Sequence, residues 1–296
     1  MAESVPASPG AAAGARSGGT WGSTLACQEV AAIGAAGFAP VGQVFGAAVY
    51  AAGSASGSSC PGVPGPAGGQ MPAPSAAQVP GPAAPGRNDP ESFASLVEAM
   101  YQAARTAIDR MTAECAALGG HGVVGVQLTR EPFPLVGLAF TAIGTAVRAG
   151  AAQAGPRQPF TCDLSGQDFT RLITAGWVPA GLALGIAIGG RHDDRATTRQ
   201  ARLWSGNAEM AGWTELVNQT RRDARRRLDE DIRRLGADGV VTAGMQMRVR
   251  QRDCPVVTGR HDHIVEVTLI GTAIARFSPA GHRPAGPALA VMPLGH

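Results

Sequence analysis

The strongest constraint on the fold is an internal repeat: the second half of the chain carries the same sequence blocks as the first half, in the same order. The first block reads A-G-aromatic-x-P-x-G-x-x-x-G in both halves. The aligned blocks are residues 36–46 with 175–185, 118–124 with 235–241, and 141–147 with 268–274. Because three blocks recur in one order, the sequence predicts two structural units of the same fold.

Each copy predicts one main helix. Residues 97–118 carry apolar side chains at spacings of three and four, which is typical of an amphipathic helix. The run 89–91 (Asp-Pro-Glu) places a capping residue, a proline and an acid where helices begin. The glycines at 119–120 supply the end of the helix. In the second copy the same apolar spacing runs through residues 224–235 and stops at Gly236.

Strands are predicted on both sides of these helices. The apolar segments 38–50 and 177–188 contain regularly placed glycines, which suggests a pair of strands or one bent strand in each copy. Met245, Met247 and Val249 alternate with polar residues, which predicts a half-exposed strand of an antiparallel sheet. We therefore expect an α+β fold of two tandem two-layer units, each with one main helix packed on a small antiparallel sheet.

The segments around the two copies differ from them in composition. Residues 53–87 are rich in Gly, Pro, Ser and Ala and have no apolar periodicity, so we expect a disordered insertion inside the first copy. The expected organisation is a tail at 1–20, a first unit at 21–148, a linker at 149–159, a second unit at 160–278 and a tail at 279–296.

Charge and cysteine content argue against several classes of protein. The net charge of +3 is small for a nucleic-acid-binding protein, and we expect no such partner. The basic segment Arg221–Arg234 also contains four acids, and we interpret it as a solvated helix face with pairs such as Asp223–Arg227; the alternative is a patch for phosphate or RNA. The five cysteines are widely spaced, and no secretory signal is evident, so we expect a reduced, cytoplasmic protein.

One uncharged stretch raises a membrane alternative. No charged residue lies between Glu29 and Arg87, and the segment Val30–Gly53 has the ~20-residue length that a membrane span requires. Pro40 and several glycines interrupt this segment, and the repeat assigns it to strands. Membrane association is therefore the less favoured interpretation.

The main candidate for chemistry is a metal site just before the last strand. His261 and His263 point to the same side of an extended chain, and Cys254 lies nearby. Imidazole and thiolate donors suit zinc or copper. The alternative is an exposed polar turn that follows Gly259. The run 192–194 (His-Asp-Asp) is a second candidate, for a hard cation. No nucleophile and base can be assembled, so we expect no enzymatic activity.

The repeated blocks resemble the YbjQ family of small bacterial proteins, which is labelled as heavy-metal-binding. Its hallmarks are a helix that ends in L-G-A-(N/D)-A-V-V-G-V and a later strand that ends in G-T-A-V. The corresponding segments here are 118–126 and 144–147 in the first copy, and 235–241 and 271–274 in the second. The resemblance implies β-α-β-β units of the dodecin-like kind that assemble into rings, five-membered in relatives. No family ligand carries over, because His121 aligns with Asp238 and Cys115 aligns with Ile232.

The resemblance and the absence of a catalytic pattern together predict a non-enzymatic, ring-forming binding or scaffold protein. We expect a homo-oligomer of five chains, about 150 kDa from five times 30.0 kDa, which could form two stacked rings, one from each kind of unit. The main competing outcome is a monomer in which a single chain pairs its own two units. Two alternatives stay open. One is an envelope-associated protein that contacts membrane through Val30–Gly53, and the other is a carrier of a flavin or nucleotide-like molecule in pockets between subunits.

Overall fold

The structure is a computed structural model. It describes residues 22–51, 93–133, 137–150, 158–193, 195–200, 209–253 and 260–277. Four predicted features lie outside these residues: the tails 1–20 and 279–296, the insertion 53–87 and the helix-start signal 89–91. Most of the predicted linker 149–159 also lies outside them.

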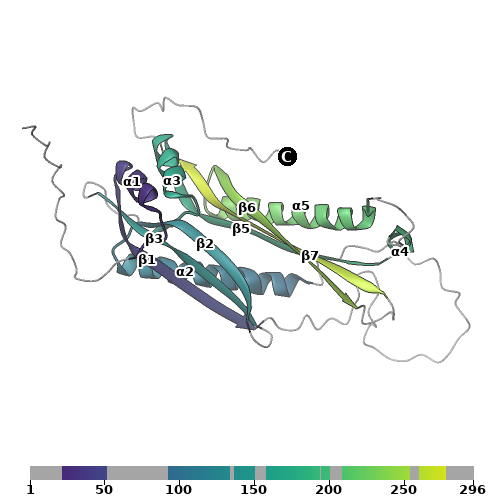
Figure 1. Cartoon of the computed structure of the whole chain (residues 1–296). Coiled ribbons are helices and arrows are strands. Elements are labelled where there is room, and N and C mark those ends of the chain that lie inside the picture. The colour runs from purple at the N-terminus through teal and green to yellow at the C-terminus, as the bar shows by residue number, and fades with distance from the viewer. Residues whose placement is uncertain are drawn as a thin grey trace, which may run out of the picture.

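The first copy folds as a helix and sheet that pack face to face (Figure 1). Its elements are α1 (Cys27–Ala35), β1 (Phe38–Ala51), α2 (Ala94–Ala117), β2 (Gly122–Phe133) and β3 (Gly137–Ala149). β3 pairs with β1 and with β2, both antiparallel. The short strand β4 (Phe160–Thr161) adds to β2 in parallel, so the sheet order is β1-β3-β2-β4.

The second copy repeats this arrangement. Its elements are α3 (Gly166–Thr174), β5 (Trp177–His192), α4 (Arg195–Gln200), α5 (Ala211–Arg234), β6 (Gly239–Asp253) and β7 (His261–Arg276). β7 pairs antiparallel with β5 and with β6, in the order β5-β7-β6. The predicted fold class is confirmed: two tandem α+β units each pack one main helix on a small sheet. The predicted segments 38–50 and 177–188 each form one long strand.

The glycine spacing that both copies share lets each main helix lie close to its sheet. A Cβ atom on Gly46 would lie 2.0 Å from the backbone oxygen of Ala107 in α2. A Cβ atom on the aligned Gly185 would lie 2.3 Å from the backbone oxygen of Ala224 in α5. Any side chain at either position would therefore push the helix away from the strand.

Three short helices, α1, α3 and α4, were not predicted. α1 and α3 precede the first strand of each copy and lie side by side at one end of the molecule (Figure 1). Ser165 caps α3, because its hydroxyl accepts a hydrogen bond from the Asp168 backbone N–H at 3.1 Å. The uncharged stretch that begins at Val30 thus divides between the end of α1 and β1. Within the described ranges, the helices all fall short of the length and apolar character that a membrane crossing needs.

β6 is an antiparallel strand with alternating side chains, as predicted, but neither of its faces is buried along residues 244–251. Met245, Met247 and Val249 are 50%, 46% and 58% exposed. On β1, an edge strand of the first sheet, Phe45 and Val49 are each 51% exposed. Large apolar side chains therefore remain uncovered on the edge strands β1 and β6.

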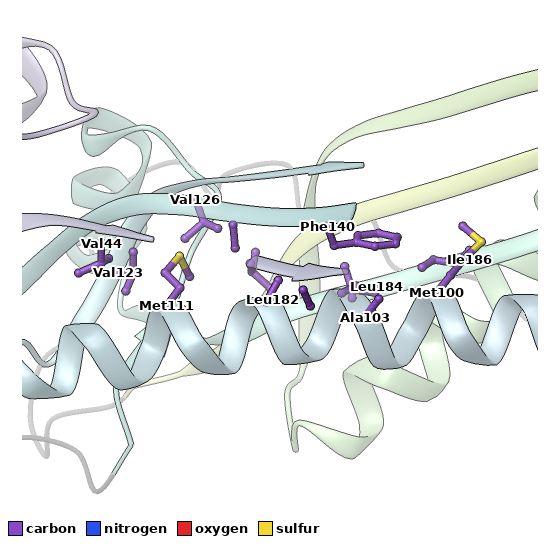
Figure 2. Packing of buried hydrophobic residues seen from close by; sticks show 14 of the residues in the cluster. Val44, Met100, Ala103, Met111, Val123, Val126, Phe140, Leu182, Leu184 and Ile186 are labelled. Atoms are coloured by element: carbon purple, nitrogen blue, oxygen red, sulfur yellow. The ribbon is translucent and has the colours of Figure 1, made fainter. Parts of the chain in front are cut away.

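One hydrophobic cluster of the core contains side chains of both copies. β5 is buried on both faces: Ala183 and Ala187 pack towards α5, whereas larger side chains on the opposite face join the core of the first copy. Figure 2 shows Leu182, Leu184 and Ile186 of β5 among the core residues around α2. The contact between the copies is thus formed largely by apolar packing on the outer face of β5.

Candidate functional site

The structure places the predicted metal ligands His261 and His263 on one face of β7, as their spacing predicts. They have different carboxylate partners. His261 Nδ1 lies 3.0 Å from Asp253 Oδ1, and His263 Nε2 lies 3.0 Å from Asp193 Oδ1. Cys254 lies outside the described residues. Among the residues that are described, no three or more His, Cys, Asp or Glu side chains are grouped as a metal site.

The contact between His263 and Asp193 has the length of an ion pair but not the angles of a hydrogen bond. Both atoms are buried and have no hydrogen-bond partner among the described residues. The Trp213 ring lies against His263, with ring centroids 4.5 Å apart. Both atoms therefore retain the capacity to bind a further partner.

The predicted run 192–194 does not converge on one point. His192 Nδ1 hydrogen-bonds Asp262 Oδ1 at 2.8 Å, and Asp262 also accepts from Arg252 Nε at 3.2 Å. Asp193 instead lies beside His263, and Asp194 is outside the described residues. His192 is thus part of a buried network with Asp262, which is fully buried.

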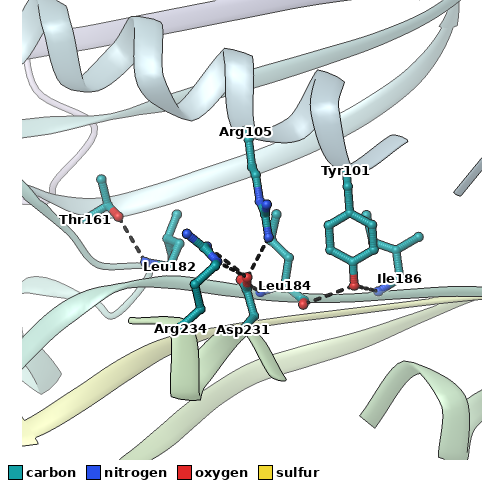
Figure 3. A network of polar contacts seen from close by, with 8 residues as sticks. All are labelled: Tyr101, Arg105, Thr161, Leu182, Leu184, Ile186, Asp231 and Arg234. Atoms are coloured by element: carbon teal, nitrogen blue, oxygen red, sulfur yellow. Dashed lines mark hydrogen bonds and ion pairs between the residues drawn. The ribbon is translucent and has the colours of Figure 1, made fainter. Parts of the chain in front are cut away.

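A network of polar contacts lies where the two copies meet (Figure 3). Tyr101 of α2 uses its hydroxyl twice on the free edge of β5: it accepts from Ile186 N at 2.7 Å and donates to Leu184 O at 3.2 Å. Burial raises the pKa of Tyr101, so the hydroxyl keeps the proton that it donates. A single side chain of the first copy therefore satisfies two backbone groups of the second.

Asp231 of α5 links the same edge to both helices. Its carboxylate accepts from Leu184 N at 3.0 Å, and it forms ion pairs of 2.7 Å with Arg105 of α2 and 2.8 Å with Arg234. Asp231 is only 4% exposed, which corrects the interpretation of residues 221–234 as a uniformly solvated face. Asp223 pairs with Arg226 rather than with the predicted Arg227.

A buried ion pair joins the two sheets. Arg130 of β2 and Glu266 of β7 lie 2.6 Å apart, with side chains 9% and 5% exposed. Arg250 of β6 adds a second contact to Glu266 at 3.0 Å. Burial lowers the pKa of Arg130, and the charge of Glu266 opposes that change. This pair has charge neutrality and direct contact, the conditions under which buried charges are tolerated.

The free edge of β1 is capped in the same way as that of β5. Phe45 N donates to Glu114 of α2 at 2.7 Å, as Leu184 N donates to Asp231. Arg110 donates to the carbonyl of Ala47, as Arg227 does to that of Ile186. Within the described residues, however, nothing takes the place of Tyr101 on the β1 edge.

The residues that align with the family's helix end have structural partners. His121 Nδ1 accepts from the Ala149 backbone N–H at 3.2 Å, and the aligned Asp238 accepts from the Arg276 N–H at 2.9 Å. Burial raises the pKa of the Cys115 thiol to about 11. The thiol is therefore protonated at neutral pH, which is not the form that binds metals.

Sequence reasoning missed the residues that join the copies. Tyr101 and Arg105 lie on a helix face that the pattern of one copy assigns to solvent. One signal was available: Glu266 interrupts the apolar run of the last strand, and a charge at such a position needs a partner.

Two comparisons with known proteins agree with this architecture. The model of the family YbjQ_1, described as "putative heavy-metal-binding", matches residues 92–150 and 178–276, one region in each copy. A protein named encapsulin nanocompartment protein, from Mycobacterium tuberculosis, is 35% identical over 202 residues, which cover 64% of this chain and 72% of that protein. No solved structure matches. The chain belongs to the YbjQ family and carries its domain twice.

Proposed function

We propose that the protein is a non-enzymatic building block that assembles with copies of itself into a ring. The observation that carries this proposal is the apolar surface of the edge strands β1 and β6. Phe45 and Val49 of β1, and Met245, Met247 and Val249 of β6, are all about half exposed in a single chain. Uncovered apolar side chains on sheet edges favour association with another chain.

The comparisons support assembly as well. The relative from Mycobacterium tuberculosis is named as a nanocompartment protein, and a compartment is built from many chains. The family resemblance supports five chains as the expected number. Assembly from a fixed number of chains is the property that a scaffold needs.

Native mass spectrometry of the purified full chain tests this function. The expected mass is about 150 kDa, five times the chain mass of 30.0 kDa. Another defined multiple would change the chain number but keep the proposal. A stable 30.0 kDa species at micromolar concentration would contradict it. Fractionation without detergent tests the membrane alternative, because a self-assembling soluble ring is expected in the supernatant.

A second proposed property is binding of zinc or copper through His261 and His263, with Cys254 as a third ligand. The observation that favours it is the unsatisfied, buried Nε2 of His263 beside an equally unsatisfied oxygen of Asp193. Neutral imidazole is the binding form, so affinity is expected to fall as the pH is lowered.

Calorimetric titration with each metal tests this site. The variant His261→Ala/His263→Ala is expected to lose binding, and Cys254→Ser to weaken it. His121→Asn is the matched control, because His121 lies away from β7 and accepts a backbone hydrogen bond. Equal binding by wild type and the double variant would exclude the site.

A further inference from the structure

We infer that neighbouring chains contact each other in the same way as the two copies do inside one chain. The contact between the copies, called the seam below, is formed by α2 and β2 of the first copy and by β5, β7 and Asp231 of the second. In the contact between chains, α5 and β6 of one chain pack against β1 and β3 of the next. The inference rests on the proposed self-assembly and specifies its interface. It follows from comparing aligned positions of the two copies.

The seam inside the chain is directional. The first copy contributes one face of α2 with β2, and the second copy contributes the outer face of β5 and β7 together with Asp231 of α5. Because the copies have the same fold, each of them has both kinds of surface. The seam uses one surface of each copy. The two surfaces left over are α5 with β6, and the outer face of β1 with β3.

The outer face of β1, which the seam leaves uncovered, carries apolar side chains at the positions that align with buried residues of β5. Leu184 and Ile188 of β5 are 1% and 5% exposed, because the first copy covers them. By the alignment that pairs Gly46 with Gly185, their counterparts in β1 are Phe45 and Val49. These are the half-exposed apolar side chains of that strand. The sequence thus preserves an apolar contact surface that no described residue covers.

The leftover face of the second copy matches it. Leu128 of β2 packs in the core at the seam, and its counterpart in β6 is the exposed Met245. Beside β6 runs an open groove with a volume of about 660 Å³, lined by Trp213, Val217 and Val249 among others. Met100, the counterpart of Val217, is 1% exposed and packs near Ile186 (Figure 2). The occupied position in one copy is therefore an open groove in the other.

The charged residues at the seam recur with the same signs. Inside the chain, Arg105 of α2 pairs with Asp231 of α5. Their counterparts are Arg222 of α5 and Glu114 of α2. Arg222 is exposed and pairs only with Glu215 of its own helix among the described residues. An Arg222–Glu114 ion pair between chains would repeat the internal one.

Both residues of the buried Arg130–Glu266 ion pair have uncharged counterparts in the other copy. The counterpart of Arg130 is Met247, and the counterpart of Glu266 is Ala139. If only one of the two charges had been replaced, the remaining one would be buried without a partner, at a large cost. Since both are replaced, the leftover surfaces remain compatible with each other. This paired change is the observation that singles out a second copy of the chain as the occupant.

The pairing of strands across the seam indicates the same arrangement of neighbouring chains. Residues just before α3 add to the edge of β2: Cys162 N donates to Val123 O at 2.9 Å, and Val126 N donates to Cys162 O at 2.9 Å. The counterparts are Ser23, just before α1, and the edge of β6 at Val240. A neighbouring chain docked by the same geometry would bring its Ser23 to this edge.

A contact that repeats in one direction closes into a ring in which first and second copies alternate. Such a ring contains an even number of copies, ten in the case of five chains. It differs from two stacked rings of like copies, which would use contacts that the internal seam does not contain.

The test transplants the internal ion pair into the proposed interface. Met247→Arg and Ala139→Glu are measured singly and together by native mass spectrometry and light scattering of the full chain. Each single change should bury an unpaired charge and raise the dissociation concentration about 100-fold or more. The combined variant should regain the wild-type assembly. Phe277→Arg is the control, because Phe277 is exposed but lies in neither surface.

The outcomes separate the inference from the proposed function. If the wild type assembles and each single variant assembles with the same dissociation concentration, this interface is overturned and self-assembly stands. Wild type that stays a monomer would overturn both. If each single variant dissociates and the combined variant also fails to assemble, the inference that positions 247 and 139 face each other between chains is overturned. Circular dichroism of each variant verifies folding.

Should a charged variant not fold, cysteine pairs provide a second measurement. Met247→Cys/Ala139→Cys treated with a bismaleimide spacer should give a ladder of covalently linked chains, above the background that wild-type cysteines give. Absence of the ladder would count against the interface.

Discussion

The Arg130–Glu266 pair provides the sharpest test of how the copies are held together. Replacing Glu266 by Ala leaves the Arg130 guanidinium, 9% exposed, without its carboxylate. Removal of one member of a buried pair costs about 3–5 kcal/mol of folding free energy. Replacing Arg130 by Met is expected to cost less, about 1–3 kcal/mol. Glu266 then keeps its contact with Arg250, whose side chain is 60% exposed.

The double variant Arg130→Met/Glu266→Ala reproduces the residues at the counterpart positions, Met247 and Ala139. It removes both charges, so its loss should be about 1 kcal/mol or less. The difference between this value and the sum of the single losses measures the coupling of the pair.

Urea denaturation followed by circular dichroism, at one fixed protein concentration, measures the four free energies of unfolding. Arg171→Ala is the control, because Arg171 and Asp168 form an exposed pair that is worth about 0.5 kcal/mol or less. The reasoning fails if Glu266→Ala costs less than about 1 kcal/mol, or if the double variant loses the sum of the two single losses.

Three further predictions concern packing, titration and thiol burial. Gly46→Ala should cost about 3 kcal/mol by overpacking against Ala107, whereas Gly34→Ala, with nothing within 4 Å, should stabilise by up to about 1 kcal/mol in urea denaturation. Burial raises the pKa of Asp163, so the free energy of unfolding should fall as the pH rises above the ordinary value near 3.8; Asp163→Asn should remove that slope in denaturation series across pH. Burial raises the pKa of Cys162 to about 12, so alkylation at pH 8 should label exposed Cys27 and spare Cys162, as peptide mass spectrometry would show.

The fold class was predictable because its signals are local and appear twice. Apolar spacing marks α2, and glycines mark the close approach of β1 and β5 to the helices. The helices α1 and α3 were missed because each has only nine residues, which is too short a segment for apolar spacing to define a helix. The Ser165-x-x-Asp168 cap was the available signal for α3.

The polar groups at the seam could not be predicted from one copy alone. Asp231 lies in a run of charges that is typical of a solvated helix, and only the edge of β5 gives it a buried partner. The face shared by His261 and His263 follows from strand alternation, but their carboxylate partners come from distant segments. Packing between copies is a long-range property that periodicity does not contain.

In the proposed assembly, the unequal charges of the two copies would also determine which copies can meet. If two first copies met by the seam geometry, Arg130 would face Ala139 and be buried unpaired. If two second copies met, Glu266 would face Met247 with the same penalty. Only unlike copies match in charge, and an unpaired buried charge costs about 3–5 kcal/mol, a preference of more than 100-fold. In the proposed assembly, the duplication would thus allow neighbouring chains to join in only one order.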